Sequence, residues 1–354
     1  MTVETPRPVI AAIQCLRGVA AFMVVLHHLQ NQTVRLGLPH VPAEALRAGV
    51  DMFFVISGFI MWVTTAARPD RTPAEFWRDR IARIVPLYWA VTAFVVAVAL
   101  AAPSVLSTTA FHGPHVAASF LFLPAAHPVT GAFQPVLIPG WTLNLEMFFY
   151  LLFGAAMIVP VRRRAGVMIG TLALLAAVGA VAQPGGAAGF LTQGVLIEFA
   201  AGIVIGMAYL SGRTPRSRRW WAVSAAGFAG LAFLPALPVD RALLWGLPSA
   251  AIVAGAALGP PLGWRPLERL GDWSYALYLS HPITLAAALK GWTMLPAAIP
   301  APLFAPAALG GAVLAAALLF RFVELPATGA ARAWLRPVGR AGGWTPRLRQ
   351  RSLR

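Results

Sequence analysis

Cysteine, lysine and acidic side chains are scarce in this sequence of 354 residues. The single cysteine, Cys15, excludes an intramolecular disulfide framework and argues against a thiolate metal site, so no metal centre is expected. The single lysine, Lys290, leaves nearly all of the positive charge to arginine. Asp and Glu total 12, and charged residues make up 11% of the chain. So little charge excludes an ordinary soluble domain.

Apolar side chains are abundant instead, at 58% of the residues, with a mean hydropathy of +0.71. Apolar runs of about 20 residues have the length that crosses a bilayer as an α-helix. Ten such runs lie at 12–31, 50–67, 85–102, 141–159, 166–182, 190–210, 220–237, 242–262, 273–290 and 302–325. We predict an all-α, polytopic membrane protein of about ten transmembrane helices, with a membrane domain over 1–326. Residues 327–354 are basic and rich in Gly and Pro, which predicts a poorly ordered cytoplasmic tail.

The arginines indicate how the chain is oriented. With both termini in the cytoplasm, the inner segments hold 22 of the 28 Lys and Arg residues, and the outer segments hold four. Cytoplasmic loops carry such an excess, so we predict cytoplasmic termini in a bacterial inner membrane. The same rule accounts for the net charge of +16, and nucleic-acid binding is not expected.

The stretch CLRGVAAFMVVLHH, residues 15–28, places an arginine and two histidines in the first apolar run. In an α-helix the eleven residues from Arg17 to His28 advance about 1100°, or three turns plus about 20°, and rise about 16 Å. Arg17 and His28 therefore share one face, whereas His27 lies about 80° away. This stripe predicts an anion-binding arginine and an acid–base histidine in one cavity, with His27 facing a neighbouring helix or lipid. A purely structural histidine is the alternative.

Polar residues in the second and third spans are the next candidates. For Asp51, at the outer end of the second span, helix capping and substrate binding are equally open. Packing is favoured over ligand binding for Ser57 and Gly58, in mid-span. Arg80 and Arg83 share a helical face on the cytoplasmic side. The pair suits phosphate oxygens, and contact with lipid headgroups is the alternative.

The later spans carry two carboxylates and a histidine. Glu146 lies six residues inside the fourth span, and a carboxylate there must be protonated, paired or facing water. Arg17 or His28 is its expected partner, and Glu198 is a lesser candidate. His281 is followed by Pro282, which kinks a helix beside many functional cavities; a structural role for it is slightly favoured.

Near the end of the tenth span, Arg321 and Glu324 are three residues apart, which predicts a local ion pair.

These stretches together resemble acyltransferase family 3, a family of bacterial integral-membrane enzymes that O-acylate lipopolysaccharide, exopolysaccharide, nodulation factors and macrolides. The resemblance runs from about Ile13 to Pro326. Its elements, in order, are LRGVAAFMVVLHH, GVDMFFVISGF, FWRDRIARIVPLY, WTLNLEMFFY, SYALYLSHP and VELP. The chain departs from many members at Gln14-Cys15 and at Ser280, and we expect no fused esterase-like domain of the kind that some polysaccharide-modifying members have.

The resemblance implies catalytic roles for Arg17, His28 and Glu146, and a role for Arg80 and Arg83 in holding acyl-CoA. It implies transfer of an acyl group, expected to be acetyl, from acyl-CoA to a hydroxyl of a sugar-containing acceptor. No permanently bound cofactor is expected, since acyl-CoA acts as the donor substrate. The further substrate-binding candidates are Asp51, Ser57, Trp141, Tyr150, Tyr278 and His281.

We expect His28 to act as a general base, in preference to a transient acyl carrier, with Glu146 orienting its imidazole. The alternative function is a proton-coupled transporter or flippase of an envelope glycoconjugate, with Glu146, Glu198 and His281 as a proton path. A structural subunit ranks last, because it leaves the stripe of Arg17 and His28 unexplained.

Overall fold

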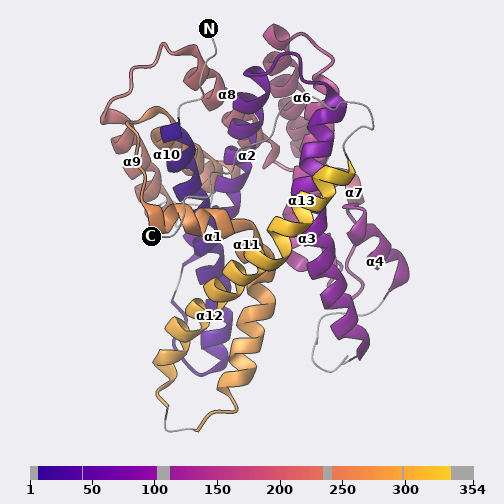
Figure 1. Ribbon diagram of the computed structural model, residues 1–354, viewed down its shortest axis with the longest axis vertical. Coiled ribbons are helices and arrows are strands. Elements are labelled where there is room, and N and C mark those ends of the chain that lie inside the picture. The colour runs from indigo at the N-terminus through magenta and orange to yellow at the C-terminus, as the bar shows by residue number, and fades with distance from the viewer. Residues whose placement is uncertain (1–6, 42, 102–111, 234–240, 297–298, 336–354) are drawn as a thin grey trace.

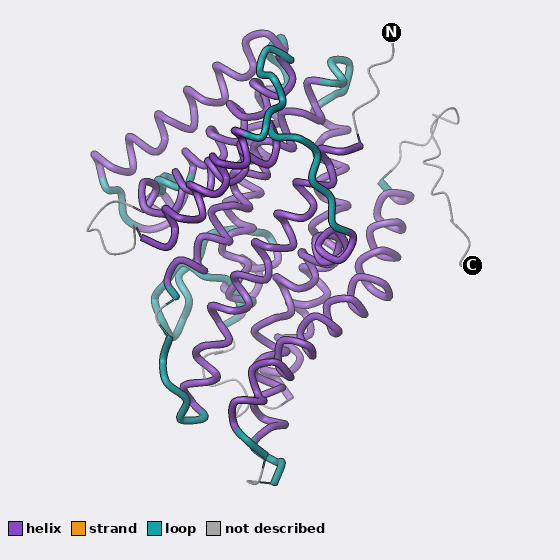
Figure 2. Tube along the Cα trace, turned by 90° about the vertical axis from the view of Figure 1, so that its left-hand side faces the viewer, coloured by secondary structure: helices purple, strands orange, loops and turns teal. Residues whose placement is uncertain are grey.

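The computed structural model describes residues 7–41, 43–101, 112–233, 241–296 and 299–335. Within these ranges the regular structure is helical, apart from one isolated bridge between Ala126 and Phe133. The α-helices are α1 (Arg7–Arg35), α2 (Gly49–Ala66), α3 (Pro73–Ala101), α4 (Gly113–Phe120), α5 (Trp141–Ala156), α6 (Val161–Ala182), α7 (Gly186–Leu191), α8 (Leu196–Ser211), α9 (Arg219–Phe233), α10 (Leu247–Leu258), α11 (Arg265–Trp292), α12 (Phe304–Leu319) and α13 (Leu325–Trp334). Most of the long helices slant in the same direction (Figure 2).

Each of the ten apolar runs is helical over most of its described residues, and the run at 190–210 is divided between α7 and α8. Six helical segments in the described part of the chain are long and apolar enough to cross a membrane. They are Ala11–Arg35, Glu44–Ala66, Pro73–Ala101, Val161–Ala182, Gly186–Ser211 and Ala301–Trp334. The all-helical, multi-spanning character is thus confirmed, while the count of ten crossings and the cytoplasmic termini stay predictions.

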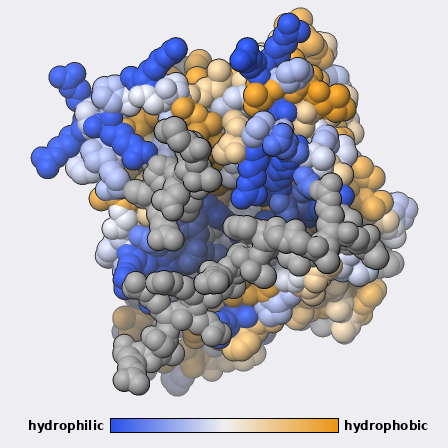
Figure 3. Space-filling model, turned by 45° about the horizontal axis from the view of Figure 1, so that its top comes forward, coloured by the Kyte–Doolittle hydropathy of each residue, from blue (hydrophilic) through white to orange (hydrophobic). Residues whose placement is uncertain are grey.

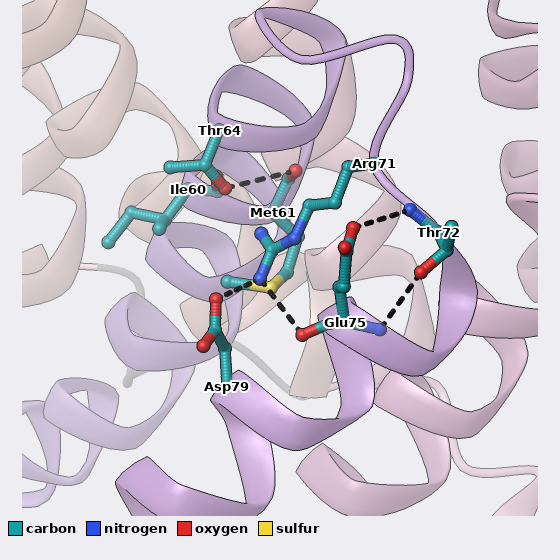
Figure 4. A network of polar contacts seen from close by, with 7 residues as sticks. All are labelled: Ile60, Met61, Thr64, Arg71, Thr72, Glu75 and Asp79. Atoms are coloured by element: carbon teal, nitrogen blue, oxygen red, sulfur yellow. Dashed lines mark hydrogen bonds and ion pairs between the residues drawn. The ribbon is translucent and has the colours of Figure 1, made fainter. Parts of the chain in front are cut away.

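The start of α3 shows how local sequence fixes the position of a site helix. The hydroxyl of Thr72 accepts the backbone N–H of Glu75 at 3.2 Å, and the Glu75 carboxylate accepts the N–H of Thr72 at 3.1 Å (Figure 4). This is a capping box, and Pro73 stands at the first helical position, where a missing N–H costs nothing. Arg71 folds back to pair with Asp79. Arg80, one residue further, therefore lies about two turns beyond a well-anchored helix start.

The helix connections at the uppermost end of Figure 1 carry much of the positive charge. Arg68 and Arg71 lie between α2 and α3, and Arg213, Arg216 and Arg218 lie between α8 and α9. Figure 3 turns this end forward and shows hydrophilic residues gathered on it in patches among apolar ones.

Glycines set the closest helix contacts. A Cβ on Gly58 would lie 2.1 Å from the Phe199 carbonyl oxygen, and one on Gly202 would lie 2.1 Å from that of Val55. The backbones of α2 and α8 therefore approach closely, as small residues allow in membranes. Packing is the role that the structure gives to Gly58, whereas its neighbour Ser57 points into a cavity described below.

We expect Gly202→Ala to destabilise the protein by about 1–3 kcal/mol, because the new methyl group meets backbone atoms that cannot move separately. Gly170→Ala on α6 is the matched control, since nothing lies within 4 Å of its Cβ position and alanine favours the helix. Thermal unfolding of the detergent-purified variants measures both effects. Equal melting temperatures for the two variants would contradict this account of the α2–α8 contact.

The chain stays helical beyond the expected end of the membrane domain. After α12 a π-turn over Phe320–Glu324 leads directly into α13, and α13 packs against α3 (Figure 1). The tail boundary expected at Pro326 therefore falls within a helix, and disorder is the wrong prediction for 327–334. Pro326 does not end the helix because it stands in the first turn of α13, where its missing N–H is tolerated. Residues 336–354 lie outside the described residues.

Candidate active site

A cavity of about 320 Å³ lies between α1, α2, α3, α5, α11 and α13. Seven of the eleven residues proposed from the sequence line it: Arg17, Ser57, Arg80, Arg83, Glu146, Tyr150 and Tyr278. They come from five helices that are distant in the sequence, so the fold brings most of the predicted site together. The remaining four, His28, Asp51, Trp141 and His281, are not on its lining.

Four arginines contribute to the cavity wall: Arg17, Arg80, Arg83 and Arg332. The guanidinium of Arg80 lies 5.9 Å from the ring centres of both Phe76 and Tyr150, and that of Arg83 lies 5.4 Å from the ring of Tyr275. Aromatic faces hold guanidinium groups while leaving their N–H donors free for a ligand. Glu146 is the only carboxylate on the lining. The wall is therefore strongly positive and suits a ligand with several negative charges.

Glu324 has a different partner from the one predicted. It is 1% exposed and forms an ion pair with Arg83 of α3, whereas Arg321 is exposed on the surface. The predicted local pair is wrong because residues 320–324 form a π-turn, which is wider than an α-turn and rotates positions three apart away from each other. Glu324 thus fixes the guanidinium of Arg83 at the cavity wall.

Glu146 also has other partners than expected. Its Oε1 accepts a hydrogen bond from the Ser57 hydroxyl at 2.7 Å and another from the hydroxyl of Tyr150, one turn further along α5. The predicted contact with Arg17 or His28 does not form. Helical spacing shows that Tyr150 shares the face of Glu146, but only the α2–α5 packing brings Ser57 to it.

One end of the lining is closed by Tyr278 of α11. Its hydroxyl lies 2.9 Å from the Thr142 hydroxyl and donates to the Pro139 carbonyl at 3.2 Å. The ring of Phe53 lies against it, with centres 5.8 Å apart. The Tyr278 ring also neighbours His281, at 5.9 Å between ring centres. Tyr278 therefore belongs to the cavity lining and also contacts His281.

His28 lies beyond Tyr278, against His281, with ring centres 4.8 Å apart. The expectation that His28 lines the cavity of Arg17 is wrong, because the helical period gives the direction of a face but not the side chains that other helices place in front of it. Nδ1 of His28 bonds to the Val24 carbonyl at 2.9 Å. A carbonyl only accepts, so Nδ1 carries the hydrogen and Nε2 keeps its lone pair. His27 is not on the lining either, and its ring meets that of His28 edge-on, with centres 5.2 Å apart.

Asp51 and Trp141 belong to a separate polar cluster. Asp51 is fully buried and pairs with Arg241 at 3.1 Å. The Arg241 guanidinium lies 4.9 Å from the ring centre of Trp245 and 5.9 Å from that of Trp141. No side-chain cap is formed at the start of α2, so helix capping, one of the two roles left open for Asp51, is not observed. Glu198 lies beside this cluster, with its side chain against Gly246.

Arg332 is the main site residue that the sequence did not reveal. It lies on α13, in the segment expected to be a tail, and its charge resembles that of any other cytoplasmic arginine. Arg332 lies eight residues, or about two helical turns, after Glu324, and a helix that continued past Glu324 would place both residues near the same face. This spacing was the signal that could have identified Arg332. Among the described residues, no group of three or more His, Cys, Asp or Glu side chains is arranged to hold a metal ion.

Comparison with known proteins agrees with the resemblance. Residues 10–321 match the model of an acyltransferase domain, acyltransferase family 3. The chain is 38% identical over 304 residues to the exopolysaccharide production protein ExoZ of Rhizobium meliloti, covering 83% of this chain and 93% of that protein.

Two further relatives are more distant. The acyltransferase MdmB of Streptomyces mycarofaciens is 27% identical, over 88% of this chain and 89% of its own length. A putative peptidoglycan O-acetyltransferase of Bacillus subtilis, YrhL, is 26% identical, over 77% of this chain and 48% of its own. No solved structure matches the chain significantly. The family model covers nearly the whole chain, and this protein is therefore a membrane acyltransferase that belongs to acyltransferase family 3.

Proposed function

We propose that this acyltransferase moves an acyl group, most simply acetyl, from cytoplasmic acyl-CoA to a hydroxyl of a sugar-containing acceptor such as an exopolysaccharide unit. The observation that carries the proposal is the cavity wall, which places four arginines beside one carboxylate. The name of ExoZ, a relative of nearly the same length, supports a polysaccharide acceptor.

The donor is argued from charge and shape. Coenzyme A carries several phosphate charges at one end and, at the other, an uncharged pantetheine arm that ends in the thioester. The phosphates are matched by the four arginines of the wall, Arg17, Arg80, Arg83 and Arg332. One guanidinium group can donate two parallel hydrogen bonds to two oxygens of a phosphate. The apolar part of the lining, formed by Phe53, Phe54, Ile60, Met61 and Ile84, suits the arm and the acyl group.

The membrane orientation follows from the charge distribution and is supported by helix directions. A Cβ on Gly271 of α11 would meet the Gln14 carbonyl oxygen of α1 at 2.0 Å. Further along both helices, His28 meets His281. Helices α1 and α11 therefore run parallel, as expected for the first and ninth of ten spans. With cytoplasmic termini, Arg17 lies toward the cytoplasm and His28 toward the outer half.

The chemistry assigned to His28 is general base catalysis. Its Nε2 lone pair takes the proton of the acceptor hydroxyl, the oxygen attacks the thioester carbonyl, and the C–S bond breaks. The proton then passes to the departing thiolate, so that free coenzyme A and an ester are formed. Glu146 holds the Ser57 and Tyr150 hydroxyls in place and offsets part of the arginine charge. A general base is favoured over an acyl-histidine because one histidine then suffices in a single ternary complex.

Arg332→Ala is expected to raise the KM for acetyl-CoA about tenfold, since a charged hydrogen bond is worth about 1.5 kcal/mol or more. The acceptor KM should stay unchanged. Arg321→Ala is the matched control, because Arg321 is exposed and does not line the cavity. Release of coenzyme A by the purified protein, followed with a thiol reagent, measures both constants. An unchanged donor KM in Arg332→Ala would argue against phosphate binding at this wall.

A further inference from the structure

The His-Pro pair in α11 fixes the tautomer of His281. Pro282 has no backbone N–H, so the carbonyl of Tyr278, four residues earlier, lacks its usual helical donor. Nδ1 of His281 lies 2.7 Å from this carbonyl and takes the vacant place. Because a carbonyl only accepts, Nδ1 carries the hydrogen, and the lone pair of neutral His281 is on Nε2.

That Nε2 lone pair is an unused acceptor in the interior. His281 is 0% exposed, and Nε2 is buried with no hydrogen-bond partner among the described residues. Buried polar atoms are usually paired, so an orphan acceptor indicates a partner that is present only at another stage of the reaction.

The ring of His28 is the group placed to become that partner. The two ring centres are 4.8 Å apart, with planes inclined at 64°. A hydrogen bond between two ring nitrogens places imidazole centres about 5 Å apart. His28 has the same tautomer as His281, so Nε2 of each neutral ring is an acceptor without a hydrogen. Two acceptors cannot form a hydrogen bond with each other, and no bond forms while both rings are neutral. A bond becomes possible once Nε2 of His28 gains a proton.

We propose that His281 is a positioning residue whose Nε2 accepts one branch of a bifurcated hydrogen bond from Nε2–H of His28 after His28 has taken the proton of the acceptor hydroxyl, the other branch staying directed at the reacting group. The proposal rests on His28 being the base of the proposed function. The acceptor O–H bond breaks as the His28 N–H bond forms, and the oxygen–carbonyl bond forms as the C–S bond breaks. His281 holds the proton-bearing imidazolium in place until the thiolate takes the proton back, and His281 itself ends unchanged.

Three substitutions of His281 separate this role from packing. Gln places an amide oxygen near the position of Nε2, Asn places its amide near Nδ1, and Leu offers neither. We expect His281→Leu and His281→Asn to lower kcat about 10–100-fold, the effect of losing a hydrogen bond to a charged group. His281→Gln should retain kcat within about tenfold of the wild type. The KM for acetyl-CoA should not change in any of them, because the bond exists only after proton transfer.

Pro282→Ala provides a test in which His281 is retained. The backbone N–H of the alanine can donate to the Tyr278 carbonyl and so competes with Nδ1–H of His281. The hydrogen of His281 is then no longer held on Nδ1, so kcat should fall while folding is preserved or improved. Equal kcat in the wild type, His281→Leu and Pro282→Ala would overturn the proposal, as would rescue by Asn in place of Gln. His28→Ala is measured in parallel. If it transfers at the wild-type rate, the proposed function fails at the base; if it is inactive while His281→Leu is normal, the failure is confined to His281.

Discussion

Replacing His28 with alanine is expected to lower single-turnover acyl transfer by about 10²–10⁴-fold, the usual cost of losing a general base. The donor should still bind with its normal affinity, because His28 lies beyond Tyr278 and contributes nothing to the arginine-lined wall. Rapid mixing of the purified variant with labelled acetyl-CoA and acceptor measures the chemical step. Equilibrium binding of acetyl-CoA measures the donor site separately.

His27→Ala is the matched control for this experiment. The two histidines are adjacent, yet the ring contact with His281 is made by His28, and the His27 ring contacts that of His28. A loss of a few-fold at most is expected for His27→Ala, from altered packing alone. If His27→Ala were inactive and His28→Ala active, the helical assignment would fail, and the active-site proposal would fail with it.

The second large effect is expected at Arg83, where binding and stability are coupled. Arg83→Ala leaves the carboxylate of Glu324 buried and without its partner, which costs about 3 kcal/mol of unfolding free energy. The same substitution removes a phosphate contact, so the KM for acetyl-CoA should rise at least tenfold. Thermal unfolding and donor kinetics on one preparation record the two losses.

The double variant Arg83→Met/Glu324→Met separates these losses. Replacing both members of a buried pair with apolar side chains is often neutral for stability. The double variant should therefore melt near the wild-type temperature and still bind acetyl-CoA weakly. Normal binding of acetyl-CoA by the double variant would show that Arg83 stabilises the fold and does not bind the donor.

Motif spacing predicts several of the residues that line the cavity. Arg17 and Glu146 stand out as charged groups inside apolar runs, where lipid does not tolerate them, and Arg80 and Arg83 as a pair on one helical face before the third run; all four line the cavity. The ten apolar runs are likewise helical over most of their described residues, because the length and hydropathy of such segments are properties of the local sequence.

The partners of these residues were not predictable in the same way. Glu146 meets Ser57, and Glu324 meets Arg83, across 89 and 241 residues of sequence. Such pairs depend on which helices face each other, which hydropathy does not encode. The meeting of His28 with His281 depends likewise on close, parallel packing of α1 and α11 at Gly271.

Transfer of labelled acetyl from acetyl-CoA by the purified protein in lipid nanodiscs tests the central claim most directly. A polysaccharide repeat unit serves as acceptor, and the ester formed is quantified for the wild type and for Arg80→Ala/Arg83→Ala. Labelled ester with the wild type, and at least a hundredfold less with the double variant at low donor concentration, is the predicted result. Equal transfer by the two proteins would contradict the assignment of the arginine-lined cavity as the acyl-CoA site.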